Sequence, residues 1–202
     1  ENYGNLVSDC KEKIQVEYVS ANPTGPLHVG HGRGAAVGSA LANLMKAAGM
    51  NVSREYYIND AGNQINNLAA SVNARYLQQL GQTVEFPENG YHGHDIIETA
   101  ERIVRIYGDR FLNMSEEERL KEFRTIALKE KLAALKEDLE AFNVTYDEWF
   151  SEQTLHDANA IKNACDLLTE RGYLYEEGGA LWLKATEYGD DKDRVVIRDK
   201  GF

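Results

Sequence analysis

One stretch of the chain decides its fold: Val16-Glu17-Tyr18-Val19-Ser20-Ala21-Asn22-Pro23-Thr24-Gly25-Pro26-Leu27-His28-Val29-Gly30-His31. It begins as an extended apolar segment, continues as a turn rich in proline and glycine, and is expected to lead directly into a helix. A strand, a turn and a helix N-terminus in this order form a phosphate-binding site, because the free amides of the first helical turn point at the ligand. The two histidines at its mouth indicate chemistry on that phosphate.

The segments around this stretch predict a parallel α/β sheet. Strands are expected over residues 14–19 and 51–58, and a helix over about 32–48 lies between them. Strand, helix and strand in this order form the repeating unit of a parallel sheet. Another helix is expected over about 62–80, so residues 1–80 are predicted to form half of a doubly wound α/β fold.

Beyond residue 80 the pattern changes to helices followed by short strands. After a polar loop over 82–93, helices are expected over 95–108, 115–142 and 155–171. Ser115 and Glu118 at the start of the second of these are typical of a capping box. Two short strands are expected on either side of Gly178-Gly179, and a further strand over 193–198. Residues 81–202 are therefore predicted to be a mainly helical insertion that ends in a small β element and returns to the predicted sheet.

Composition excludes some classes of protein. In 202 residues with 43% hydrophobic content, no apolar run approaches the roughly 20 residues of a membrane span. The net charge of −11 repels nucleic-acid backbones, so this chain alone is not expected to bind nucleic acid through counterion release. Cys10 and Cys165 lie outside any metal-type spacing, which favours reduced thiols and a cytoplasmic protein.

The chemistry is expected where the first strand ends and the next helix begins. Gly30 has no Cβ, so a flat ring or a phosphate can approach the backbone there. The imidazoles of His28 and His31 can donate hydrogen bonds to oxygens whose charge grows in a phosphoryl transition state. Glu17, Ser20 and Asn22 follow the strand, at the edge where open α/β sheets bind ligands.

The same residues resemble a known family. His28-Val29-Gly30-His31 is similar to the HIGH motif of class I aminoacyl-tRNA synthetases, with valine in place of isoleucine. Three further stretches narrow the resemblance to arginyl-tRNA synthetases of the bacterial type: Glu17-Tyr18-Val19-Ser20-Ala21-Asn22-Pro23, Tyr57-Ile58-Asn59-Asp60-Ala61-Gly62-Asn63-Gln64 and Gly189-Asp190-Asp191-Lys192-Asp193-Arg194. This likeness extends over essentially the whole chain.

The resemblance implies an arginine–tRNA ligase with the class I Rossmann-like (HUP-type) fold. Such an enzyme activates arginine with ATP and Mg²⁺ and transfers it to the 3′ end of tRNA(Arg). The family pattern assigns catalysis to His28 and His31, and ATP binding to His28, Gly30, His31 and Gly32. It assigns arginine binding to Glu17, Ser20, Ala21, Asn22 and His31. A cytoplasmic monomer with no membrane or metal site of its own is expected.

The sequence also departs from the family. Many relatives carry a lysine just before the HIGH motif, where this chain has Thr24-Gly25-Pro26. In the family that lysine is thought to replace a basic residue of the KMSKS loop, so its absence indicates that the parent protein keeps a functional loop of this kind. The KMSKS loop, the residues that clamp the guanidinium and the anticodon-binding domain are missing from this sequence. The chain is therefore expected to be an incomplete catalytic fragment that is inactive alone.

Several residues allow two interpretations. Asn59, Asp60 and Gln64 follow a strand end beside the proposed site, which favours ligand contact, but the same residues are ordinary in turns. His92 and His94 suggest a metal site, although we favour a solvated loop that caps the next helix at Asp95. Trp149 and Trp182 are predicted to be core residues of the insertion.

Three alternative functions remain open. An NAD-binding oxidoreductase would use Gly30, Gly32 and Ala35 as its fingerprint, with Asp60 on the ribose, but the Pro-Thr-Gly-Pro loop before the first glycine and the late position of the acid argue against it. A non-catalytic synthetase-like module would bind a partner or a small ligand only. A metal-dependent hydrolase would use the four histidines at positions 28, 31, 92 and 94.

Overall fold

The computed structural model describes residues 3–7 and 12–198, which form two compact units. Contacts divide the chain into residues 1–152 and residues 153–202. The domain boundary that the sequence suggests at residue 80 stays a prediction. Within the described residues, no helix is both long and apolar enough to cross a membrane.

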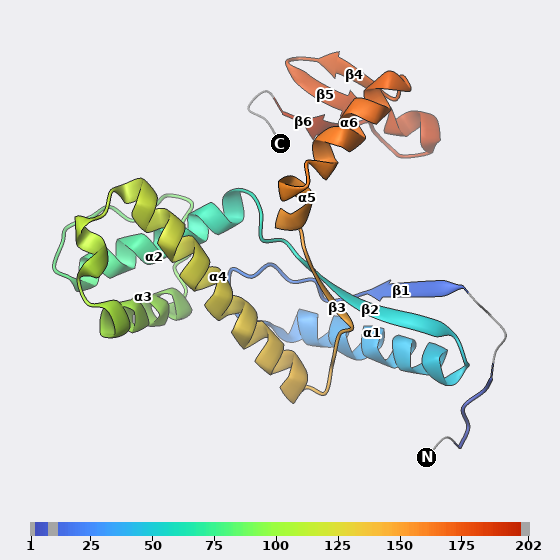
Figure 1. Ribbon diagram of the computed structural model, residues 1–202, viewed down its shortest axis with the longest axis horizontal. Coiled ribbons are helices and arrows are strands. Elements are labelled where there is room, and N and C mark those ends of the chain that lie inside the picture. Colours follow the sequence, from blue (N-terminus) through green and yellow to red (C-terminus); the bar gives the residue numbers. More distant parts are fainter. Residues whose placement is uncertain (1–2, 8–11, 199–202) are drawn as a thin grey trace. The chain divides into compact units, whose positions relative to one another are not determined.

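The first unit contains a parallel three-stranded sheet, which confirms the predicted α/β class (Figure 1). Its strand order is β1 (Lys13–Glu17), β2 (Asn51–Ile58) and β3 (Glu148–Ser151). Helix α1 (Val29–Ala47) connects β1 to β2 and packs on both strands. The register pairs Glu17 with Glu55, so the carboxyl ends of β1 and β2 lie at the same edge of the sheet.

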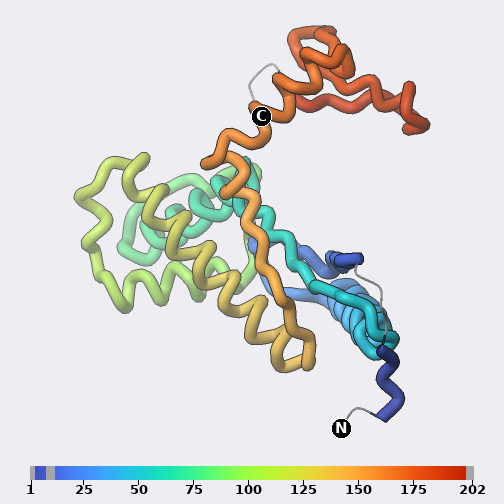
Figure 2. The backbone as a smooth tube through the Cα atoms, turned by 45° about the vertical axis from the view of Figure 1, so that its right-hand side comes forward, coloured from blue at the N-terminus to red at the C-terminus, as the bar shows by residue number. Residues whose placement is uncertain are grey.

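Strand β3 was not predicted. It is only 4 residues long, and it returns the chain to the sheet at residue 148, where it pairs with β2 (Figure 2). Trp149 consequently belongs to the core of the sheet and not to the insertion, which corrects the prediction. Its ring stacks on Tyr56 at a centroid distance of 4.5 Å and meets Tyr146 edge to face at 5.1 Å. This aromatic packing anchors β3 despite its shortness.

Three long helices fill the crossover from β2 to β3. They are α2 (Asn63–Gln79), α3 (His94–Tyr107) and α4 (Glu116–Ala141), with the short helix η1 (Arg110–Asn113) between the last two. Tyr76, Phe111 and Phe123 form the centre of their shared core. The capping box at the start of α4 is confirmed, because Ser115 and Glu118 each accept a hydrogen bond from the other's backbone amide.

The second unit has a different arrangement. It contains α5 (Gln153–Asp157), α6 (Ala160–Glu170), β4 (Leu174–Glu177), β5 (Ala180–Leu183), η2 (Ala185–Tyr188) and β6 (Arg194–Ile197). The three strands form an antiparallel sheet in the order β4-β5-β6. The further strand predicted over 193–198 is present as β6, which pairs with β5 in this antiparallel sheet. The chain returns to the parallel sheet earlier, through β3.

The single helix predicted over 155–171 is wrong in detail. Asn159 has a left-handed φ of 52°, a conformation that asparagine tolerates and that ends a right-handed helix, so two helices form instead of one. Cys165 is a free, buried thiol on α6, whereas Cys10 lies outside the described residues. Trp182 is partly buried on β5, and its indole donates to the Glu177 carbonyl at 3.1 Å.

Candidate functional site

The predicted site lies at the carboxyl edge of the parallel sheet. Residues 18–28 connect the end of β1 to the start of α1, and the buried Pro23 fixes the middle of this loop. Helix α1 begins at Val29, earlier than the predicted start near Gly32. The sequence pattern placed the start of the helix too late, because the helix N-terminus is capped by a type of side chain that is unusual at this position.

That cap is made by the two histidines themselves. The Nδ1 atom of His28, the N-cap residue, accepts a hydrogen bond from the Gly30 amide at 3.1 Å. The Nδ1 atom of His31 in turn accepts from the His28 amide at 3.2 Å, so the pair forms a reciprocal capping box. The rings stack with centroids 3.7 Å apart and an interplanar angle of 22°.

The cap selects the tautomer that each ring adopts when it is neutral. A nitrogen that accepts a hydrogen bond carries no proton, so each neutral imidazole has its proton on Nε2. Within the described part of the chain, neither Nε2 is used in a hydrogen bond, and both N–H groups remain for a ligand. Burial lowers the pKa of His31, and the neighbouring His28 lowers it further. The cap therefore leaves an Nε2–H donor on each ring for a ligand, and the lowered pKa of His31 favours its neutral form.

The glycines of the first turn leave room for this arrangement. A Cβ on Gly30 would lie only 2.9 Å from Cε1 of His28, so a side chain there would displace the capping ring. A Cβ on Gly32 would meet nothing within 4 Å, which leaves the backbone open at that point. Both glycines lie inside α1 and not in a turn before it, which contradicts the dinucleotide-fingerprint interpretation.

The loop after β1 is held in an unusual conformation. Val19 and Ser20 have φ values of 69° and 41°, in the left-handed region that costs a non-glycine residue about 1–3 kcal/mol. Strand β2 holds the loop at two points: the Tyr57 amide donates to Ser20 Oγ at 3.1 Å, and the Tyr56 hydroxyl donates to the Ala21 carbonyl at 2.8 Å. Ala21 is buried. Glu17 and Asn22 flank the loop and are exposed.

The residues after β2 divide into two kinds. Asp60 is buried, its Oδ2 accepts from Ser151 Oγ at 2.6 Å, and Arg124 of α4 donates to its carbonyl at 3.1 Å. It thereby ties the end of β2 to β3 and α4. Asn59 is half-buried beside it, and Gln64 is exposed in the first turn of α2.

Two residues that the sequence analysis missed lie at the same edge. The Tyr57 hydroxyl is hydrogen-bonded to Glu152, which directly follows β3. Burial raises the pKa of Tyr57, and the carboxylates of Glu152, Asp60 and Glu17 raise it further. The edge therefore carries a negative potential suited to a cation. Recognition of β3 in the sequence would have placed Glu152 here.

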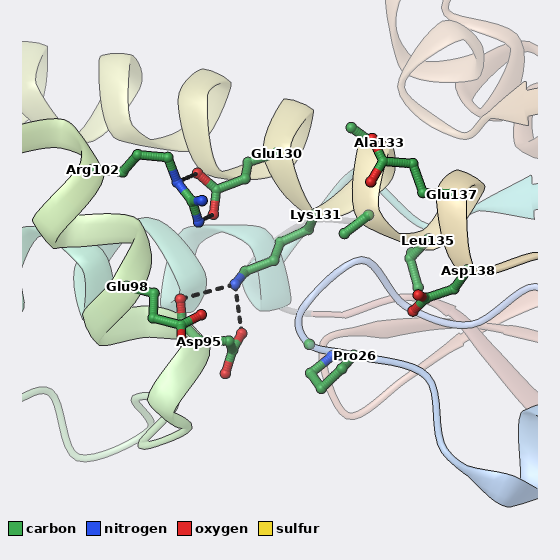
Figure 3. A pocket seen from close by; sticks show the side chains of 12 residues that line it. Pro26, Asp95, Glu98, Arg102, Glu130, Lys131, Ala133, Leu135, Glu137 and Asp138 are labelled. Carbon is green, nitrogen blue, oxygen red and sulfur yellow. Dashed lines mark hydrogen bonds and ion pairs between the residues drawn. The ribbon is translucent and has the colours of Figure 1, made fainter. Parts of the chain in front are cut away.

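A pocket of about 320 Å³ lies beside the turn at Gly25 and Pro26 (Figure 3). Figure 3 shows Lys131 of α4 directed at Asp95 of α3, and the two side chains form an ion pair at 2.5 Å. Arg102 and Glu130 form a second, bidentate pair across the same helices. These pairs fix α3 against α4 beside the turn.

The second pair of histidines does not join the site. Asp95 lies in the first turn of α3, as the favoured interpretation expects. The expected cap is not found, because the N-cap residue is Gly93, which provides no side-chain hydrogen bond, and His94 already belongs to the helix and contacts Glu98 at 3.1 Å. His92 packs against Phe86 with ring centroids 4.5 Å apart. Over residues 3–7 and 12–198, no group of three or more histidines, cysteines or carboxylates could hold a metal ion.

Comparisons with known proteins cover the whole chain. Residues 2–202 match the family described as tRNA synthetases class I (R), catalytic domain. An arginine–tRNA ligase of Carboxydothermus hydrogenoformans is 56% identical over 201 residues, which are 100% of this chain and 36% of the relative. One from Listeria welshimeri is 56% identical over 199 residues, 98% of this chain and again 36% of the relative. The chain thus spans about a third of the length of these curated relatives.

Solved structures agree. A putative arginyl-tRNA synthetase from Campylobacter jejuni matches with a TM-score of 0.86 and 36% identity, over 100% of this chain and 44% of that one. An arginyl-tRNA synthetase from Thermus thermophilus matches with a TM-score of 0.67 and 26% identity, over 98% of this chain and 34% of that one. The sequence match over residues 2–202 and the shared fold lead to one conclusion: this chain belongs to the family of class I tRNA synthetase catalytic domains of the arginine (R) type.

Proposed function

We propose that the chain is part of the catalytic domain of an arginine–tRNA ligase. In the first step the carboxylate of arginine attacks the α-phosphorus of ATP, an oxygen–phosphorus bond forms, and pyrophosphate leaves. In the second step the arginyl group passes from the adenylate to a hydroxyl of the 3′-terminal adenosine of tRNA(Arg), and AMP leaves. The names of the relatives support the choice of arginine.

The observation that carries the proposal is the reciprocal histidine cap. It holds the rings of His28 and His31 in parallel at the N-terminus of α1 and reserves both Nε2–H groups for a ligand. Donors of this kind stabilise the charge that grows on phosphate oxygens in the transition state, with about 3 kcal/mol per donor. The positive end of the helix dipole acts in the same direction.

The backbone around Gly30 and Gly32 is proposed to contact ATP. A Cβ at position 32 would meet no neighbouring atom, so the nucleotide can approach the helix there. Mg²⁺ is proposed to arrive bound to the polyphosphate of ATP, as part of that substrate.

The amino acid is proposed to bind at the carboxyl edge of the sheet. Ser20, Ala21 and Asn22 come from the held loop after β1, and His31 lies at the start of α1. The carboxylates around Tyr57, including that of Glu17, favour a substrate with a cationic side chain. Asn59 and Gln64 are candidates for further ligand contacts, whereas Asp60 acts through the side chains that it ties together.

The wider setting is also a proposal. We expect tRNA(Arg) to bind through parts of the full-length ligase outside this chain, because the net charge of −11 disfavours a phosphate backbone here. A cytoplasmic monomer is proposed, and gel filtration and cell fractionation of the full-length ligase test this.

The direct test is ATP–pyrophosphate exchange by the full-length ligase, with bulk tRNA present, across a panel of amino acids. Exchange that depends on arginine alone supports the proposal. Exchange with a different amino acid would retain the reaction and refute the specificity. No exchange with any amino acid would favour the non-catalytic binding module.

A further inference from the structure

Two tyrosine hydroxyls hold the backbone on either side of the left-handed pair Val19 and Ser20. The Tyr146 hydroxyl donates to the Tyr18 carbonyl at 3.1 Å, on one side of the pair. The Tyr56 hydroxyl donates to the Ala21 carbonyl at 2.8 Å, on the other side. One tyrosine comes from β2 and the other from the segment before β3, so both are provided by elements outside the loop.

The rings that carry these hydroxyls are themselves fixed. Tyr56 is fully buried, stacks on Trp149 at 4.5 Å, and meets Tyr146 edge to face at 5.3 Å with an interplanar angle of 85°. Tyr146 also lies against Tyr18 at 4.7 Å. Neither hydroxyl can change its position without disturbing the core of the sheet, so the two carbonyls are held at fixed points.

Both hydroxyls stay protonated and therefore remain donors. Burial raises the pKa of Tyr56 to about 12, although its hydrogen bond to Ala21 acts in the opposite direction. Burial likewise raises the pKa of Tyr146, with additional contributions from Tyr18 and Tyr56. The hold on the loop is thus independent of pH across the working range of an enzyme.

We propose that Tyr56 and Tyr146 are positioning residues for the amino-acid substrate, because their hydroxyls hold residues 19–21 in a conformation that these residues would otherwise leave. This inference rests on the proposed function, in which Ser20, Ala21 and Asn22 bind arginine. The residues on both sides of the left-handed pair are fixed, and the loop then presents its polar groups without reorganisation when the substrate arrives.

The test uses Tyr56→Phe and Tyr146→Phe in the full-length ligase, with pyrophosphate exchange measured at varied arginine and at varied ATP. We expect each variant to raise the KM for arginine about tenfold, equivalent to about 1.4 kcal/mol. The KM for ATP should stay within about twofold of the wild-type value, because the histidine cap lies on a different element.

Tyr76→Phe is the matched control. Tyr76 is also fully buried, and its hydroxyl donates to a backbone carbonyl, that of Gly108, at 2.9 Å. It lies in the helical core, away from the loop. This variant should lose a comparable amount of stability to Tyr56→Phe and keep the wild-type KM for arginine. A rise in the KM for arginine in all three variants would overturn the inference, since it would report lost stability only.

A double-mutant cycle with Val19→Gly tests whether the hydroxyl acts through the backbone. Glycine adopts the left-handed conformation freely, so the loop should depend less on the Tyr56 hydroxyl. We expect Tyr56→Phe to raise the KM for arginine about threefold in the Val19→Gly background, compared with about tenfold in the wild type. An equal effect in both backgrounds would refute positioning through the strained backbone.

The outcomes separate this inference from the proposed function. If the wild-type ligase shows no arginine-dependent exchange, the proposed function fails first. If the wild type exchanges with arginine and both tyrosine variants keep its KM values, only the positioning role is refuted.

Discussion

The double role of His28 leads to a prediction that separates stability from chemistry. Its Nδ1 caps α1 through the Gly30 amide at 3.1 Å, and its Nε2–H is proposed to contact a phosphate of ATP. His28→Ala removes both functions. His28→Asn removes the Nε2–H donor but keeps a side-chain oxygen, and asparagine is among the best N-cap residues.

The expected magnitudes differ for the two properties. Loss of a side-chain cap costs about 1 kcal/mol, so His28→Ala should lower the free energy of unfolding of the chain by about that amount. His28→Asn should stay within about 0.5 kcal/mol of the wild type. Both variants should lower the rate of adenylate formation about 100-fold, because both lose the same transition-state donor.

Two assays check these values. Urea denaturation followed by circular dichroism gives the stability of the 202-residue chain, and single-turnover adenylate formation by the full-length ligase gives the rate. A His28→Asn variant with activity within threefold of the wild type would refute the donor role. A His28→Ala variant that unfolds at the wild-type urea concentration would refute the cap.

Three further predictions concern the surroundings of the site. His31 should titrate below its ordinary pKa of 6.5 in NMR spectra. Because the unfolded chain then takes up the proton first, the contribution of His31 to stability should be complete above pH 6.5 and be lost as the pH falls through the folded-state pKa. A midpoint above 6.5 would contradict the lowering of the pKa by partial burial and by His28. Gly38→Ala should destabilise the chain by about 2 kcal/mol in urea denaturation, because the new Cβ would overlap the Tyr18 ring. The control Gly34→Ala, with open space around it in the same helix, should stabilise the chain by about 1 kcal/mol, and equal effects of the two changes would refute the packing argument. Lys131→Met should destabilise the chain by about 3 kcal/mol, because the Asp95 carboxylate loses the nearly buried ammonium group with which it pairs. Lys121→Met breaks an exposed ion pair and should leave the urea midpoint unchanged. Equal midpoints for the two variants would contradict this reasoning.

The long elements of the fold were predictable from local chemistry. The alternation of apolar and polar residues before Tyr18 gave β1, and the comparisons confirm the family that the histidine motif predicts. The capping box at Ser115 placed the start of α4 within one residue, since the pattern of serine and glutamate that satisfies the end amides is local. These features depend on residues that are neighbours in the sequence.

The parts that were missed depend on contacts distant in the sequence. Strand β3 has only 4 residues and no alternation, and it is held by Trp149 stacking on Tyr56, a residue that is far away in the chain. The start of α1 was placed too late because histidine is not among the usual N-cap residues. Asn159 divides the predicted helix because its backbone is in the left-handed conformation. The spacing of apolar residues does not predict such a conformation.

In the candidate site, too, the local motif was predictable and the contacts between distant residues were not. The sequence motif identified His28 and His31. It did not reveal that the Nδ1 atom of each ring accepts a backbone hydrogen bond in the cap of α1. The roles of Tyr56 and Tyr146 depend on the left-handed conformation of Val19 and Ser20, which valine and serine rarely adopt and which no propensity predicts. Binding roles of the individual site residues remain predictions.

The central claim is that the histidine cap presents two Nε2–H donors to ATP while the acidic edge of the sheet receives the cation of the amino acid. A crystal structure of the full-length ligase with arginine and a non-hydrolysable ATP analogue tests it most directly. The account predicts both Nε2 atoms within hydrogen-bonding distance of phosphate oxygens, and the guanidinium beside the carboxylates that surround Tyr57. Phosphates bound elsewhere, or a histidine that turns Nδ1 towards them and releases the helix cap, would contradict it.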